Sequence, residues 1–104
     1  MDDEMKIYYR AQLMNLQDHE IVARLEYSAV QLEQIKLYAH YHMALGTSPH
    51  PSTKQITRGD GHVYSQDEIR QDYMNTALRH IQNLEEVAWW RSEAHLELGR
   101  RKSA

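Results

Sequence analysis

The chain has 104 residues, enough for one domain with a modest core, and the absence of cysteine excludes disulfide bonds and thiolate metal sites. Its net charge of −3 does not provide the positive field that nonspecific binding to duplex DNA needs. Its first residues, MDDEMKIYYR, lack the pattern of a signal peptide and no run approaches the roughly 18 apolar residues of a membrane span, so we expect a cytoplasmic protein that does not enter membranes.

A short helix is expected first, over about residues 3–14. It carries Tyr8, Tyr9 and Arg10, which place two aromatic rings beside a guanidinium group. A helix of this length is marginally stable in water on its own, so we expect it to pack against the rest of the chain.

The second helix is expected over about residues 18–45, after a cap at Asn15 or Asp18. Its apolar residues recur at spacings of three and four, which is typical of an amphipathic helix: Ile21, Leu25, Ala29, Leu32, Ile35, Ala39 and Met43. A loop over residues 46–65 follows, with both prolines and three of the four glycines. Within it, residues 55–64 are predicted either as a small β-hairpin about Gly59-Asp60-Gly61 or as irregular loop.

The third helix is expected over about residues 66–98. Ser65 and Glu68 have the spacing of a capping box, and Gly99 followed by basic residues is a plausible C-terminal stop. The apolar stripe, with Trp90 and Arg91 at its edge, consists of Ile69, Tyr73, Ala77, Ile81, Leu84, Ala88, Ala94 and Leu98. The sequence therefore predicts a single all-α domain: a short helix, then two long antiparallel helices that form a hairpin.

Two adjacent tryptophans, Trp89 and Trp90, cannot both face the same neighbour. Successive side chains on a helix diverge by about 100°. We expect one tryptophan to pack inside the hairpin and the other to pack against another protomer. A hairpin also has no third layer to cover exposed aromatic residues such as Tyr38 and Tyr41, and this favours a homo-oligomer.

No arrangement of residues indicates catalysis or metal binding. There is no nucleophile motif and no glycine-rich phosphate loop, and the adjacent Glu85 and Glu86 diverge on a helix. His40 and His42 lie about 200° apart around a helix, so they cannot share one ion. We expect a protein that is not an enzyme and that uses no metal and no cofactor.

Residues suited to binding a ligand are more evident. The first helix carries Tyr8, Tyr9 and Arg10, and on the later helices Arg24 and Tyr27 share one helix face, as do Arg79 and Gln82. Aromatic rings stack on bases and arginine pairs with phosphate, so these residues suit a nucleotide ligand. The alternative, which composition and spacing favour, is that the tyrosines pack in interfaces and the arginines pair with nearby glutamates in water.

The order of elements resembles the phage helical-hairpin family of anti-CBASS and anti-Thoeris sponges. The similarity lies in 9-YRAQLMNLQDHEIVARL-25 and 77-ALRHIQNLEEVAWWRSEA-94, about half of the chain, and is most specific where Arg79, Ala88, Arg91 and Ala94 fall at family-like spacing. Members are small helical homo-oligomers that sequester cyclic nucleotide immune signals. The resemblance implies the same function here, in the cytoplasm of a host cell if the protein is phage-encoded.

The family's pocket uses an aromatic residue near the N-terminus and a basic residue in the long helix. Tyr9 matches the first, but Glu26, Tyr27 and Ser28 stand where the lysine is expected, and Arg24 is the substitute. The candidate ligand-binding residues are therefore Tyr8, Tyr9, Arg10, Arg24, Tyr27, Arg79 and Arg91, with Arg79 or Arg91 supplied by a neighbouring chain. The alternative function is a small interaction protein whose aromatic face docks and inhibits a host protein.

Self-association is directly measurable. We expect light scattering at micromolar concentration to give a mass of at least two chains, and Trp89→Ala or Trp90→Ala to lower that mass. A monodisperse monomer of 12.3 kDa with full helicity would contradict the expectation.

Overall fold

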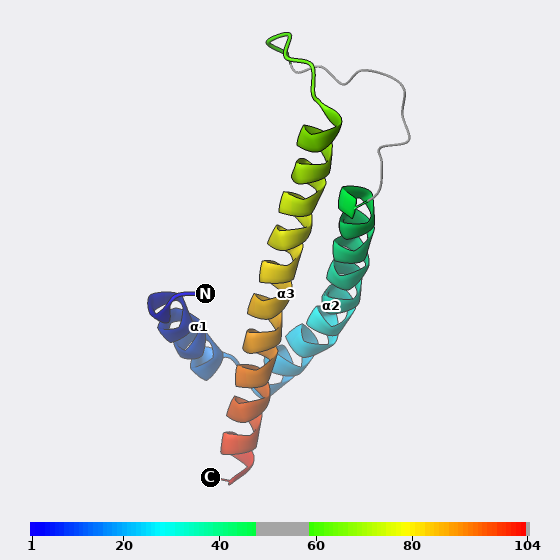
Figure 1. Ribbon diagram of the computed structural model, residues 1–104. Helices are drawn as coiled ribbons and strands as arrows, with labels where there is room; N and C mark the ends of the chain where they lie inside the picture. The colour runs from blue at the N-terminus through cyan, green and yellow to red at the C-terminus, as the bar shows by residue number, and fades with distance from the viewer. Residues whose placement is uncertain (48–58, 104) are drawn as a thin grey trace. The chain divides into compact units, whose positions relative to one another are not determined.

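The computed structural model describes residues 1–47 and 59–103, in which the chain forms three helices and no strand. The helices are α1 (Asp3–Asn15), α2 (Asp18–Thr47) and α3 (Gln66–Ser103), as Figure 1 shows. The predicted all-α class is confirmed. Of the candidate β-hairpin, residues 55–58 lie outside the described residues, and residues 59–64 form a turn at Gly59-Asp60 and a single bridge position at Val63 without a strand.

The chain divides into two compact units. Unit 1 consists of Met1–Gln34 and Asn83–Ala104, and unit 2 consists of Ile35–Gln82. Both long helices contribute a segment to each unit. Within residues 1–47 and 59–103, no helix combines the length and the apolar character needed to cross a bilayer.

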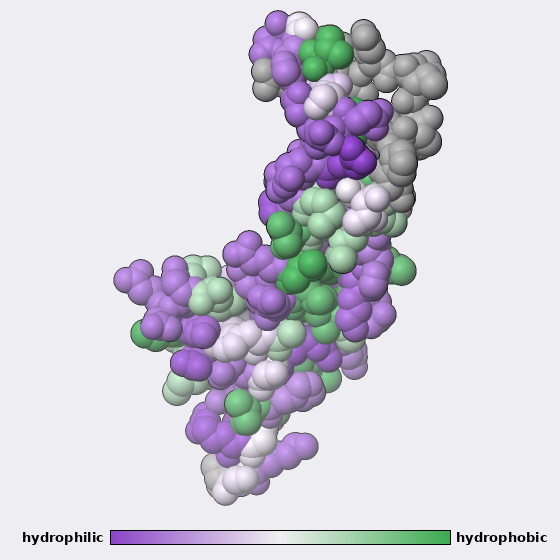
Figure 2. All heavy atoms as spheres, in the orientation of Figure 1, coloured by the Kyte–Doolittle hydropathy of each residue, from purple (hydrophilic) through white to green (hydrophobic). Residues whose placement is uncertain are grey.

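The core of unit 1 joins all three helices. Leu13 of α1 and Ile21 of α2 are fully buried, and they pack with Leu25 and with Ala94 of α3. Leu16, Trp90 and Leu98 cover this cluster. The short first helix is therefore docked through Leu13, as its length requires, while hydrophilic and apolar side chains are mixed over its exposed surface (Figure 2).

The buried positions of α2 differ from the predicted stripe. They follow one another at steps of four, three, seven and four residues: Ile21, Leu25, Ser28, Ile35 and Ala39. Ser28 therefore takes the position expected for Ala29, and both Ala29 and Met43 are exposed. On α3, Ala77 and Ala94 are buried as predicted, whereas Ala88 is exposed.

Unit 2 packs α2 against α3 through rings and a close backbone approach. His80 stacks on Tyr38 with ring centroids 5.9 Å apart, and it also lies 5.2 Å from His42. Gly46 lies so close to α3 that a Cβ atom there would stand 2.6 Å from the side chain of Met74. The last turns of α2 therefore approach the first turns of α3 closely because residue 46 has no side chain.

The beginnings of the helices are capped by side chains. The Asp2 carboxylate accepts a hydrogen bond from the Met5 N–H at 2.8 Å. The predicted capping box is present, because the Glu68 N–H donates to Ser65 Oγ at 3.1 Å and the Ser65 N–H donates to Glu68 Oε1 at 3.3 Å. A hydrogen bond with His62, together with these contacts, lowers the pKa of Glu68.

The predicted stop at Gly99 is wrong, because α3 continues to Ser103. Glycine inside a helix costs about 1 kcal/mol relative to alanine, and side chains on either side of it offset this cost. Glu97 accepts hydrogen bonds from Arg100 and Arg101 across Gly99. Arg101 also donates to Asp18 Oδ1 at 2.7 Å and to the Leu13 carbonyl at 3.0 Å, so the last turn is tied to the junction of α1 and α2.

We predict that Glu97 makes the fold sensitive to acid. The hydrogen bonds from Arg100 and then Arg101 lower the pKa of this carboxyl to about 2, from 4.5. Its contribution is fully present above the unfolded pKa of 4.5 and is lost as the pH falls through the folded pKa, so the window is pH 4.5 to 2. Glu97→Gln should lower the free energy of unfolding at pH 7 and flatten its decline between pH 4.5 and 2, measured by urea denaturation.

Glu85→Gln is the matched control, since Glu85 is exposed and on the same helix. It should leave both the stability at pH 7 and the pH profile close to those of the parent chain. Equal pH profiles for Glu97→Gln and the parent would contradict this role of Glu97.

Candidate ligand pocket

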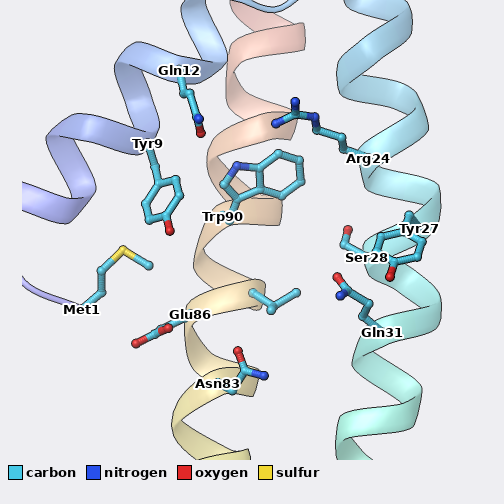
Figure 3. A pocket seen from close by; sticks show the side chains of 11 residues that line it. Met1, Tyr9, Gln12, Arg24, Tyr27, Ser28, Gln31, Asn83, Glu86 and Trp90 are labelled. Carbon is cyan, nitrogen blue, oxygen red and sulfur yellow. The ribbon is translucent and has the colours of Figure 1, made fainter.

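A pocket of about 310 Å³ lies within unit 1, at the lower end of the size range of small-molecule sites. All three helices contribute to it, as Figure 3 shows. The eleven lining residues are Met1, Tyr9, Gln12, Arg24, Tyr27, Ser28, Gln31, Asn83, Glu86, Val87 and Trp90.

Each helix supplies one aromatic ring to this pocket. Tyr9 comes from α1, Tyr27 from α2 and Trp90 from α3. Trp90 packs against the core of unit 1, and the edge of the Tyr8 ring meets Tyr9 with centroids 5.4 Å apart. Tyr27 is 67% exposed and forms the outer wall. Two supported rings and one exposed ring are thus available for stacking on a planar ligand.

The uncharged polar groups that line the pocket include three side-chain amides and one serine hydroxyl. Gln12, Gln31 and Asn83 each carry one acceptor and two donor hydrogens, so they can adapt to different ligand edges. Ser28 is buried at the base, where its hydroxyl donates to the Leu25 carbonyl at 3.0 Å.

Two charged side chains enter the pocket from different helices. Arg24 projects from α2 and Glu86 from α3. Neither forms a hydrogen bond or an ion pair with any residue in the described ranges 1–47 and 59–103. Both charges are therefore free to interact with a ligand.

The structure brings together three of the seven predicted ligand residues: Tyr9, Arg24 and Tyr27 line the pocket. Tyr8 supports Tyr9 from outside it. Arg10 does not line the pocket, because its guanidinium pairs with Glu93 at 3.2 Å and covers the Trp89 ring at 5.5 Å.

The two arginines predicted on the last helix have other roles. Arg91 is partly buried between α2 and α3, where it donates to Ser28 Oγ at 2.5 Å and to the Leu25 carbonyl. Arg79 belongs to unit 2, is exposed and donates to Thr76 Oγ1 at 3.2 Å. Within the chain, Arg91 is a structural residue of the helix pair.

The adjacent tryptophans both find neighbours in their own chain. Trp90 packs against the core inside the helix pair, as expected for one of them. The ring of Trp89, the other of the two, is covered by Arg10 of α1, and packing of either tryptophan against another protomer stays a prediction. A second surface of each ring remains for the pocket or for a partner, since both residues are only partly buried.

Sequence reasoning did not identify eight of the eleven lining residues: Met1, Gln12, Ser28, Gln31, Asn83, Glu86, Val87 and Trp90. For three of the polar ones, a signal exists in the spacing. Gln12 lies three residues after Tyr9, Gln31 lies four after Tyr27, and Glu86 lies four before Trp90. Each polar residue therefore shares a helix face with an aromatic residue, a pairing that could have indicated one common site.

A second hollow in unit 1, about 430 Å³, is a weaker candidate. Its charged residues neutralise one another, because Arg10 pairs with Glu93 and Arg100 pairs with Glu97. The aromatic pocket, whose Arg24 and Glu86 are free, is the better ligand site.

No protein-family model, curated protein or solved structure matches this chain. The pocket is therefore interpreted from its own residues and geometry.

We predict that Arg91 supports the fold. Arg91→Ala removes the donor to Ser28 and to the Leu25 carbonyl, which are buried, and should lower the free energy of unfolding by about 1–3 kcal/mol. Arg79→Ala, the matched control, removes an exposed arginine and should change it by less than about 0.5 kcal/mol. Chemical denaturation followed by circular dichroism measures both; equal effects would contradict the structural role.

Proposed function

We propose that the protein binds a cyclic nucleotide in the pocket of unit 1 and sequesters it without converting it. One observation carries the proposal: the rings of Tyr9 and Trp90 and the free guanidinium of Arg24 line the same pocket. This combination fits the two chemical parts of a nucleotide. The cyclic form of the ligand follows from the resemblance to the sponge family.

The base and the phosphate have different requirements, and the pocket meets both. A base needs flat apolar faces, and stacking on an aromatic side chain contributes about 1–3 kcal/mol per base. A phosphate needs fixed cationic donors, and arginine offers a planar pair of N–H groups that can bind two oxygens at once. Tyr9 and Trp90 supply the first requirement, and Arg24 supplies the second.

The lining also supports a role in binding without catalysis. Glu86 is the one carboxylate among the eleven lining residues, and no histidine or lysine lies beside it there. The one serine among these lining residues is Ser28. Its hydroxyl donates a hydrogen bond to the Leu25 carbonyl and accepts one from Arg91. A general base held against an activated nucleophile is therefore not assembled in this pocket.

The exposed aromatic face of α2 favours a second candidate function, the docking and inhibition of a host protein. Leu37, Tyr38 and Tyr41 are 69%, 55% and 61% exposed, although all three are large and partly apolar. Contiguous apolar residues of this kind often mark protein interfaces. This function would use unit 2 and would not require the pocket.

A ligand screen tests the proposal. Cyclic dinucleotides, cyclic trinucleotides and cyclic ADP-ribose isomers are added separately, and thermal unfolding is followed. At a hundredfold excess over its dissociation constant, a ligand stabilises the folded state by about 2.7 kcal/mol, which shifts the melting temperature measurably. Tyr9→Ala and Arg24→Ala should each weaken binding of the active ligand at least about tenfold, by loss of stacking or of the phosphate donor.

Two control variants match these substitutions. Tyr41→Ala and Arg79→Ala remove the same residue types from exposed positions of unit 2, and binding should be unchanged. Mass spectrometry of ligand released by heat should return the compound intact. Failure of all these ligands to shift the melting temperature would refute the proposal, and recovery of a cleaved product would refute sequestration.

A further inference from the structure

We infer that the pocket selects guanine among the bases, with Glu86 as the residue that determines this specificity. The inference rests on the proposed function and names the base that the same pocket prefers. It starts from an unusual feature of a candidate phosphate site: a free carboxylate lines it together with the arginine. A carboxylate repels phosphate, so its role must be toward another part of the ligand.

Glu86 is placed to meet the edge of a stacked base. It lies four residues before Trp90 on α3, so the two side chains share a helix face. In Figure 3 the Glu86 carboxylate lies below Tyr9 on the side of α3 that faces α1, whereas Arg24 reaches over Trp90 from α2. A planar ring between Tyr9 and Trp90 thus has the carboxylate at one end and the guanidinium toward the other.

The chemistry of a carboxylate then distinguishes the bases. An ionised carboxylate only accepts hydrogen bonds, through two oxygens. Guanine presents two adjacent donors, N1–H and the 2-amino group, on its Watson–Crick edge. Adenine presents the 6-amino donor beside the N1 lone pair, and that lone pair would face a carboxylate oxygen. A site that pairs with both guanine donors therefore disfavours adenine.

The amides of the pocket cannot make this distinction. Gln12, Gln31 and Asn83 can turn to present either an oxygen or an NH₂ group, so they can pair with any base edge. Glu86 has no donor to present while it is ionised. Selectivity for a pair of donors therefore depends on Glu86, the one lining side chain that only accepts hydrogen bonds.

The size of the pocket sets which ligands reveal the selectivity. A volume of about 310 Å³ suits one nucleotide unit better than a whole cyclic dinucleotide, so one base of the ligand occupies the pocket. Symmetric cyclic dinucleotides are then the clearest probes, because their two bases are identical and either one can occupy the pocket.

Isothermal titration calorimetry with the full chain tests the inference, using cyclic di-GMP, cyclic di-AMP and cyclic di-IMP. Hypoxanthine keeps the N1–H donor and lacks the 2-amino group. We expect cyclic di-GMP to bind about tenfold or more tightly than cyclic di-AMP, with cyclic di-IMP between them. Two hydrogen bonds from a carboxylate to one base edge discriminate between bases by about this factor.

The variant Glu86→Gln should reduce the ratio of guanine to adenine affinity severalfold, because an amide can also donate to the adenine N1. Glu85→Gln, the exposed neighbour that does not line the pocket, should leave the ratio unchanged. If the ratio in Glu86→Gln equals that of the parent chain, the role of Glu86 is overturned.

The outcomes separate the two proposals. Equal binding of the guanine and adenine compounds, or tighter binding of cyclic di-AMP, overturns guanine selection and leaves the nucleotide-binding function supported. If none of these compounds and none of the cyclic trinucleotides or cyclic ADP-ribose isomers binds, the proposed function fails and the inference fails with it. Tight binding of cyclic di-GMP that depends on Tyr9, Arg24 and Glu86 supports both.

Discussion

The docking of α1 on α2 and α3 is the contact on which the pocket depends. A helix of 13 residues is close to the limit of stability in water, so it needs tertiary contacts. Leu13 packs with Ile21 and Ala94, and Arg10, one turn earlier on the same side of α1, contacts Glu93 and the Trp89 ring of α3. Tyr9 enters the pocket because both of these attachments hold the helix that carries it.

Hydrogen bonds between α2 and α3 explain why Arg24, and not Arg91, is available to bind a ligand. Arg91 lies on α3 at a position that faces α2, and its Nη1 group donates to Ser28 Oγ and to the Leu25 carbonyl. Buried polar groups that are fully hydrogen-bonded define one arrangement of neighbouring elements, because a shift in register would leave donors unpaired. Arg24 lies one turn away on the exposed side of α2, so it can contribute its charge to the pocket without weakening the core.

Local patterns predicted the fold class and the first residues of the three helices well. The capping box at Ser65 and the apolar periodicity are properties of neighbouring residues, and these depend little on the rest of the chain. The end of α3 was wrong because Arg101 contacts Asp18, 83 residues away in sequence, and a local reading of Gly99 contains no such information.

The candidate site was only partly predictable for a related reason. Tyr9, Arg24 and Tyr27 were identified by residue type, which indicates chemistry. Arg10 and Arg91 have the same chemistry, but tertiary partners occupy them. Glu86 was considered only as a possible catalytic acid beside Glu85, because an isolated helix gives no indication of which of its polar residues will face another helix across a pocket.

The discontinuous composition of unit 1 has a consequence for the order of folding. Its two segments, Met1–Gln34 and Asn83–Ala104, are separated by the whole of unit 2, and the contact of Arg101 with the Leu13 carbonyl spans 88 residues. Contacts between distant residues require a large loss of chain entropy before they form, whereas unit 2 is a single continuous segment. The contact between Tyr38 and His80 in unit 2 therefore closes a shorter loop of chain than the contact between Arg101 and Leu13 in unit 1. During translation, the contacts of α1 with Ala94 and Arg101 can form only once those residues have been synthesised.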